Sequence, residues 1–240
     1  MAKKILFFCI FLLISVGITR FLLSKIEIYS TENQAMLLNS ITSFYAPKQL
    51  ILDVPYINEA PDGKFSGNWK NACEEASMAM VEKYYLGINS VSVAEAKSVM
   101  QKLFDYQNKI YGSNHNSDAV RTAEIIKNVL SYNAEIKTDP TIRNIKNQII
   151  NKQPVISLHY GFDLKNPNIP FAINGSYYHM MVVVGYDDTT REFIVHDDGD
   201  QKNGTNYRYE YDLFMNSLHD YIYVTNTTNG PARVIFTSKK

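Results

Sequence analysis

Cysteine is scarce in this sequence: the 240-residue chain has two, Cys9 and Cys73. Cys9 lies in an apolar run near the N-terminus, so the remainder contains one cysteine and cannot form an internal disulfide. We therefore expect Cys73 to be a free thiol. No His/Cys cluster has the spacing of a zinc site, and the acids at 197–200 lack the twelve-residue calcium loop with its terminal acid. No metal and no organic cofactor are predicted.

The sequence also lacks an excess of charge of either sign. Lys plus Arg and Asp plus Glu number 24 each, which gives a formal net charge of zero. There is no long basic block, so nucleic acid is excluded as the expected partner. The length suits one domain with a short appendage, and a hydrophobic content of 45% is ample for a packed core.

The N-terminus differs from the rest because a basic start precedes an apolar run. Lys3 and Lys4 are followed by mainly apolar residues over 5–18, a pattern typical of an export signal. Two interpretations of residues 1–24 stay open: a membrane anchor, or a signal peptide that is cleaved to release a secreted protein. The lack of an Ala-x-Ala site favours the single-pass anchor. Both place the domain, predicted over residues 49–240 after a linker at 25–48, outside the cytoplasm.

Helical patterns come first in the domain and strand patterns later, which indicates an α+β fold rather than an alternating parallel sheet. The predicted helices cover residues 73–85, 92–106, 118–132 and 141–152. The predicted strands cover residues 49–57, 154–160, 178–186, 192–196, 207–211, 221–224 and 233–236.

Cys73 stands where a thiol is expected to become reactive. It opens a predicted helix over 73–85, with Asn71 as a plausible N-cap. A helix N-terminus carries unpaired N–H groups and a partial positive charge, which favour thiolate over thiol. A nucleophilic thiol also needs a base within hydrogen-bond reach and a group that orients the base.

The best candidate among five histidines for that base is His179, at the start of a strongly apolar predicted strand. A turn at 187–191 joins this strand to the next, so the two form a hairpin. His179 and Asp197 lie about equally far from the turn, and the register permits an imidazole–carboxylate pair. Spacing alone does not distinguish Asp197 from Asp198. We interpret His159 and His196 as structural.

Four motifs, at residues 54–57, 72–80, 179–187 and 193–197, occur in a familiar order. Through these motifs the chain resembles the peptidase-like domains related to bacteriocin-leader-processing cysteine peptidases, which are family thirty-nine of the cysteine peptidases. The resemblance covers about residues 50–225. The resemblance implies a papain-like α+β fold, with an N-terminal helical part and a C-terminal antiparallel sheet. It further implies Cys73 as the nucleophile, His179 as the base and Asp197 as the residue that orients His179.

The chain departs from this family at two positions. Many members have Cys-Gly-Pro where this chain has Cys73, Glu74 and Glu75, and the two acids oppose thiolate formation unless a protonated His179 is close. Such enzymes also place a glutamine ahead of the cysteine as an oxyanion donor, where this chain has Glu59. A carboxylate cannot donate a hydrogen bond, so Glu59 must be protonated, or replaced by Asn58 or by the backbone N–H of Cys73.

Two aromatic residues near the expected site, Trp69 and Tyr178, have two equal interpretations. They either line a substrate cleft or belong to the core.

The sequence therefore predicts an exported cysteine peptidase that cleaves peptide or peptide-like amide bonds through Cys73, His179 and Asp197. Two alternatives remain: a catalytically inactive papain-like module that binds peptides, which Glu59 favours, and acyl or amide transfer on cell-wall peptides. The sequence gives neither the substrate preference nor the oligomeric state.

Overall fold

A seven-stranded antiparallel sheet organises the computed structural model, which describes residues 46–169 and 177–240. The strand order is β2-β7-β3-β4-β5-β6, and β1 pairs with the end of β4. Within this part of the chain, Lys48–Lys240 forms one compact unit. The strands are β1 (Gln49–Ile51), β2 (Tyr132–Thr138), β3 (Val155–Tyr160), β4 (Tyr178–Asp187), β5 (Glu192–His196), β6 (Tyr207–Glu210) and β7 (Arg233–Lys239).

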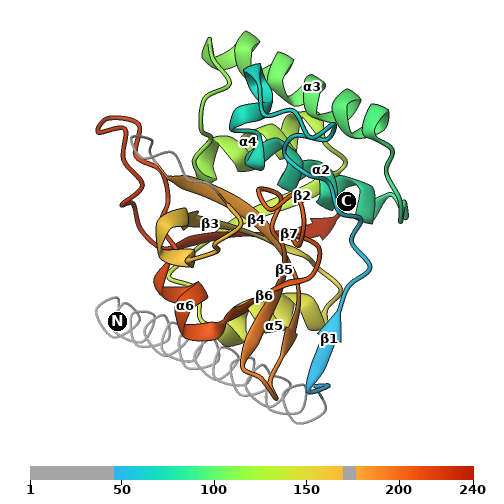
Figure 1. Ribbon diagram of the computed structural model, residues 1–240, viewed down its shortest axis with the longest axis vertical. Coiled ribbons are helices and arrows are strands. Elements are labelled where there is room, and N and C mark those ends of the chain that lie inside the picture. Colours follow the sequence, from blue (N-terminus) through green and yellow to red (C-terminus); the bar gives the residue numbers. More distant parts are fainter. Residues whose placement is uncertain (1–45, 170–176) are drawn as a thin grey trace, which may run out of the picture. The chain divides into compact units, whose positions relative to one another are not determined.

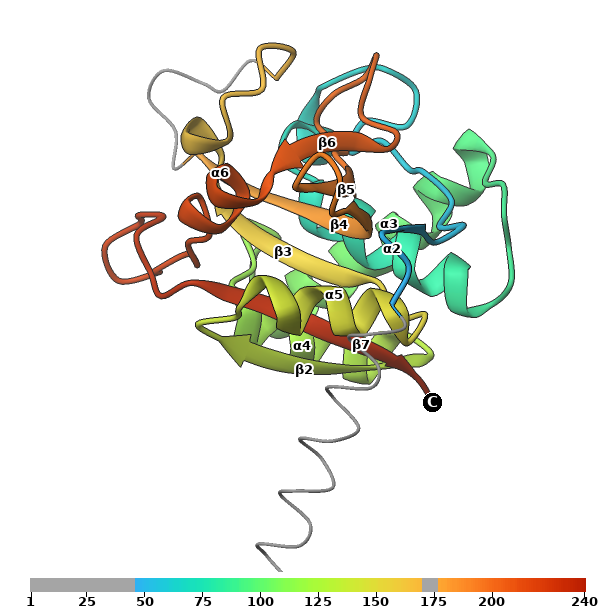
Figure 2. The same cartoon turned by 90° about the horizontal axis from the view of Figure 1, so that it is seen from below.

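Helices cover both faces of the sheet. Figure 1 shows α2, α3 and α4 grouped on one side of it and α5 and α6 on the other, and Figure 2 shows β7 running between β2 and β3. The helices are α2 (Cys73–Tyr85), α3 (Val93–Tyr111), α4 (Ala119–Val129), α5 (Ile142–Ile150) and α6 (Tyr211–Asn216), with 3-10 helices η1 (Gly67–Lys70) and η2 (Gly161–Leu164). This mixed architecture confirms the predicted α+β class.

Local sequence signals fix where three of the helices begin. Ser92 and Glu95 form a capping box at the start of α3, in which each side chain bonds to the backbone of the other residue. Asp118 caps α4 and Thr141 caps α5 through their side chains. These caps stand at the three positions where the sequence predicts helix starts.

Strand β4 lies at the centre of the fold and carries the site. All ten of its residues are buried, because helices pack on both faces and β3 and β5 pair with its two sides. Each fully buried Val or Met side chain contributes about 1.5–3 kcal/mol to stability. Helix α2 packs directly against β4, so the helix that begins at Cys73 and the strand that contains His179 form one rigid support.

Several predicted boundaries are wrong. The helix predicted over 118–132 ends at Val129, and Tyr132 begins β2, because pairing with β7 outweighs the helical pattern of the last residues. The strand predicted over 49–57 has three residues. Residues 221–224 form a turn region with one isolated bridge, between Ile222 and Thr227, rather than a strand. Tyr211, predicted to end a strand, begins α6 instead.

Asn71 does not cap α2. The N-cap is Ala72, whose side chain cannot accept a hydrogen bond. The start of α2 is instead occupied by the acids of its own first turn, Glu74 and Glu75.

The predicted export segment, residues 1–24, and Cys9 within it lie outside the described residues. Within residues 46–169 and 177–240, no helix is both long enough and apolar enough to cross a membrane.

Candidate active site

The β4–β5 hairpin brings His179 and Asp197 together. Val182 pairs with His196, and a bulge between Val183 and Gly185 shifts the register near the turn. Asp197, one residue beyond β5, then lies beside the start of β4. The result is a hydrogen bond of 2.8 Å between His179 Nε2 and Asp197 Oδ1, as the spacing of the sequence predicts.

Asp197 is fully buried and its carboxylate is well supplied with donors. Besides His179, the amide of Asn166 donates to Oδ2 at 3.1 Å and the hydroxyl of Tyr209 donates to the same oxygen. Burial alone would raise the pKa of Asp197, but the charge and hydrogen bond of His179, with the bonds from Tyr209 and Asn166, lower it. Asp197 is therefore an anion in the folded protein.

The imidazole of His179 responds in the opposite direction. Burial alone would lower its pKa, but the charge and hydrogen bond of Asp197 outweigh burial, and Glu59 and Glu74 add to the effect, so the pKa is raised. The site thus favours an imidazolium–carboxylate pair. A histidine held in this way has a fixed ring orientation, which is what a general base requires.

Cys73 lies in the first turn of α2 and is 4% exposed. Its sulfur donates a hydrogen bond of 3.1 Å to Glu74 Oε2. Burial, followed by the charges of Glu74, Asp198 and Glu59, raises the pKa of the thiol well above its ordinary value. The expectation that the helix N-terminus favours the thiolate is therefore wrong for this environment, because desolvation and acidic neighbours outweigh the dipole.

The acids near Cys73 are also neighbours of His179. Glu59 and Glu74 both raise the pKa of the thiol and both raise the pKa of the imidazole. The thiol and the imidazole therefore share one buried acidic environment, although they come from α2 and β4.

Glu59 lies in the segment before η1, where its backbone N–H donates to the carbonyl of Asp198 at 3.1 Å. A Cβ on Gly199 would lie 3.2 Å from His179 Cε1 and 3.5 Å from Glu59 Oε1, so both groups adjoin this glycine. Burial raises the pKa of Glu59 to about 7, although the nearby His179 charge opposes the rise. Burial thus favours the protonated form of Glu59, which can donate a hydrogen bond.

The geometry distinguishes the two aspartates that spacing leaves equivalent. Asp198 bonds to a different partner: its Oδ2 accepts a hydrogen bond of 3.1 Å from Ser77 Oγ. Its Oδ1 is buried and has no hydrogen-bond partner among the described residues. Burial raises the pKa of Asp198 well above its ordinary value, and the charges of Glu59 and Asp197 add to the rise. Burial therefore disfavours the charged form of Asp198, whereas the partners of Asp197 favour its charged form.

Of the remaining predicted site residues, Asn58 has a structural role. Its amide donates to Tyr56 Oη at 3.1 Å and to the carbonyl of Asp198 at 2.6 Å, and its Oδ1 accepts from the N–H of Ala60 at 2.9 Å. Because both amide hydrogens are used, Asn58 is not available to replace Glu59 as an oxyanion donor.

The two aromatic candidates lie in different surroundings. Trp69 is half-buried and packs edge-on against Phe104 of α3, with ring centroids 5.3 Å apart, which favours the core interpretation. Tyr178 is buried beside His179, and its hydroxyl donates to the carbonyl of Ser117 at 2.9 Å. Its pKa is raised by burial and then by acids that include Glu74, so Tyr178 adjoins the acidic cluster.

Sequence reasoning did not identify the partners that hold the site, namely Asn166, Tyr209, Ser117 and Gln107. Tyr209 lies in the strand that follows β5, so a search for polar residues on the next strand could have found it. Asn166 comes from the irregular segment after η2, for which the sequence has no signal.

The other expectations concern histidines and metals. His159 Nδ1 bonds to Ser217 Oγ at 2.8 Å, and His196 Nε2 bonds to the carbonyl of Val54 at 2.7 Å, which confirms the structural interpretation of both. Among the described residues, no group of three His, Cys, Asp or Glu side chains could hold a metal ion.

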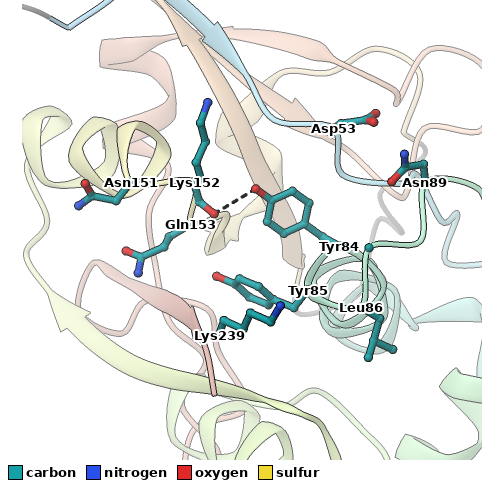
Figure 3. A pocket seen from close by; sticks show the side chains of 10 residues that line it. Asp53, Tyr84, Tyr85, Leu86, Asn89, Asn151, Lys152, Gln153 and Lys239 are labelled. Carbon is teal, nitrogen blue, oxygen red and sulfur yellow. Dashed lines mark hydrogen bonds between the residues drawn. The ribbon is translucent and has the colours of Figure 1, made fainter.

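A pocket of about 530 Å³ lies at the other end of α2, where Tyr84 and Tyr85 line it together with residues of the turn before β3 (Figure 3). The Tyr84 hydroxyl donates to the carbonyl of Lys152 at 3.1 Å, the bond drawn in Figure 3. Helix rise separates Tyr85 from Cys73 by about 18 Å, so this pocket is not the thiol site.

Comparisons with known proteins concern the family and the fold. The Peptidase_C39-like family matches residues 51–229. A crystal structure assigned as a C39-like peptidase from Bacillus anthracis is 18% identical with a TM-score of 0.51, and the match covers 80% of this chain and 98% of that one. Xylellain, a cysteine protease from Xylella fastidiosa, is 12% identical with a TM-score of 0.37, covering 79% and 85%.

No functionally curated protein matches the chain. The likeness to the Bacillus anthracis structure shows the fold, and the family match spans most of the chain. The chain belongs to the Peptidase_C39-like family.

Proposed function

We propose that this protein is a cysteine peptidase that cleaves peptide or peptide-like amide bonds, with Cys73 as nucleophile, His179 as base and Asp197 as the residue that orients the base. The observation that carries the proposal is the buried 2.8 Å hydrogen bond between His179 Nε2 and Asp197 Oδ1, in an acidic environment shared with Cys73. If the His179–Asp197 pair had only a structural role, there would be no reason for a buried thiol at a helix start to share its environment.

In the proposed reaction, His179 in its uncharged form, with Nε2 bonded to Asp197, takes the proton of Cys73 on Nδ1 while the sulfur attacks the scissile carbonyl carbon. The imidazolium then gives this proton to the leaving amine, the C–N bond breaks, and a thioester remains on Cys73. Water, deprotonated by His179, hydrolyses the thioester and restores the thiol. Asp197 holds the ring and stabilises its charged form throughout.

Oxyanion stabilisation is assigned to two donors. The backbone N–H of Cys73 lies in the first turn of α2, where N–H groups lack intrahelical partners. Glu59 is the second donor in its protonated form, which its pKa of about 7 makes available at neutral and acidic pH. It takes the place of the amide that Asn58 cannot supply.

One observation favours the alternative, a non-catalytic module that binds peptides. The raised pKa of Cys73 leaves little thiolate in the resting protein, so the thiol depends on His179 at the moment of attack. A protein that has lost catalysis would show the same buried thiol without the transfer of its proton.

The two functions are separated by a screen of peptide substrates with the wild-type protein, Cys73→Ala and His179→Ala. We expect turnover by the wild type and its loss in both variants. Binding of peptides by all three proteins without turnover by any would refute the peptidase and support the binding module.

The export of the protein, as an anchored or a secreted form, is a further part of the proposal and rests on the pattern of residues 1–24. N-terminal sequencing of the mature protein, together with its distribution between membrane and soluble fractions, tests it. A mature protein that begins at Met1 and is found in the cytoplasm would contradict export.

A further inference from the structure

The thiol of Cys73 directs its single hydrogen to the next residue in the chain. Sγ lies 3.1 Å from Glu74 Oε2 and is the donor in this bond. A thiol has one hydrogen, so while it points to Glu74 it is not available to an imidazole. Cys73 is 4% exposed and Glu74 is 2% exposed, so water does not compete for either group.

A network of hydrogen bonds fixes the Glu74 carboxylate in this position. The backbone N–H of Ser117 donates to Glu74 Oε1 at 2.8 Å, which leaves Oε2 for the sulfur. Ser117 Oγ donates to Gln107 Oε1 at 2.7 Å, and the Gln107 amide donates to Glu75. The carboxylate is therefore held from α3 and from the turn before α4, not only from its own helix.

We propose that Glu74 is a positioning residue that holds the proton of Cys73 on the sulfur in the substrate-free protein. The inference rests on the proposed function, in which His179 takes this proton. The S–H group must turn from Glu74 Oε2 towards His179 before the S–H bond breaks and an N–H bond forms on the imidazole. Glu74 thus keeps the nucleophile inactive until the site is rearranged by a bound substrate.

The charges around the thiol agree with this role. Glu74 of α2, Asp198 after β5 and Glu59 before η1 all raise the pKa of Cys73, and after burial Glu74 has the largest effect. His179 of β4 is the cation that opposes the negative charges of Glu59 and Glu74. Removal of the Glu74 charge should therefore change the acidity of the thiol more than removal of any other acid.

Glu75 offers a matched control. It is the next residue, is 1% exposed and is also glutamate, but its carboxyl bonds to Gln107 and not to the sulfur. Burial and the charge of Glu74 raise the pKa of Glu75 well above its ordinary value. Glu75→Gln therefore changes a buried glutamate that does not contact the sulfur, whereas Glu74→Gln changes the acceptor of the thiol hydrogen bond.

The experiment measures the rate of alkylation of Cys73 by iodoacetamide against pH in the full chain, with Cys73→Ala subtracted to remove the contribution of Cys9. In Glu74→Gln we expect the pH of half-ionisation to fall by at least about one pH unit. The rate at pH 7 should rise about threefold, because a tenfold gain in thiolate is partly offset by its lower nucleophilicity. Glu75→Gln should follow the wild-type profile.

An unchanged profile in Glu74→Gln, or an equal shift in Glu75→Gln, would overturn the proposal. This failure is distinct from failure of the proposed function, which would appear as undiminished peptidase activity in His179→Ala. A second measurement needs no variant of Glu74: the infrared S–H stretch of Cys73, assigned by subtraction of Cys73→Ala, should lie at lower frequency in the folded than in the unfolded protein. Equal frequencies would overturn the proposal independently.

Discussion

The pKa values of buried acids shift in opposite directions in the β4–β5 hairpin and at the start of α2. In the hairpin, Asp197 receives hydrogen bonds from His179, Asn166 and Tyr209, and its pKa is lowered. At the start of α2, burial outweighs the hydrogen bonds that Glu74 and Glu75 accept, and their pKa values are raised. The surroundings of Asp197 favour its charged form, whereas burial at the start of α2 disfavours the charged forms of Glu74 and Glu75.

The difference teaches that the position of a thiol does not determine its acidity. Cys73 has the helix N-terminus that favours a thiolate, yet the acids around it keep the proton on the sulfur. Activation then depends on the hairpin, whose imidazole is the nearby cation.

The largest expected effect comes from removal of the base on the hairpin. His179→Ala should lower kcat/KM for a peptide substrate by at least about 10³-fold, because the thiol loses the proposed acceptor of its proton. His159→Gln serves as the control, since His159 bonds to Ser217 and takes no part in the proposed reaction. Equal losses in the two variants would show that the effect is structural.

Substitution of Asp197 should lower the free energy of unfolding much more than substitution of its neighbour Asp198. Asp197→Ala leaves His179, Asn166 and Tyr209 without their acceptor and should lower the free energy of unfolding by about 3–5 kcal/mol. Asp198→Asn should change it by less than about 1 kcal/mol, because burial disfavours the charge of Asp198 and one of its oxygens has no hydrogen-bond partner among the described residues. Urea unfolding at pH 7 checks both values, and similar losses would remove the distinction between the two sides of the site.

The acidic side should also make stability depend on pH. The pKa of Glu59 is about 7 in the folded protein against an ordinary value of 4.5, so the native state binds more protons between these pH values. Stability should therefore fall as pH rises through this window, by up to about 3 kcal/mol from Glu59 alone. Glu59→Gln should reduce the fall, because an amide does not titrate; urea unfolding at pH 5 and pH 8 measures it.

The same substitution tests the oxyanion role of Glu59. Wild-type activity should decline as pH rises above about 7, where Glu59 loses the proton that it donates. Glu59→Gln retains a donor at every pH and should keep its activity at pH 8. A decline at the same pH in both proteins would assign it to another group.

The smallest effect is expected outside both regions. Trp69→Phe retains an aromatic contact with Phe104 and should cost less than about 1 kcal/mol, with kcat/KM unchanged. A selective rise in KM for peptides would instead place Trp69 in the substrate cleft.

The sequence was sufficient for the fold class, for most of the helices and strands, and for the pairing of His179 with Asp197. These depend on periodicity, caps and hairpin spacing, which are local properties. The end of α4 and the existence of β2 were not predictable in this way, because β2 forms only through its pairing with β7, about a hundred residues later.

The ionisation of the site was the least predictable part. The sequence shows that Glu74 and Glu75 adjoin the thiol, but their charge depends on burial and on Ser117 and Gln107, which lie elsewhere in the chain. Likewise, the preference for Asp197 over Asp198 depends on side-chain direction at the end of β5, which spacing does not determine.

The position of β7 between β2 and β3 has a consequence for the order of folding. Residues 233–239 are synthesised about a hundred residues after the start of β2, yet without them β2 and β3 have no shared neighbour in the sheet. During translation the sheet therefore stays open, with two strand edges exposed, until residues 233–239 leave the ribosome. Loss of β7 would leave the edges of β2 and β3 exposed to aggregation.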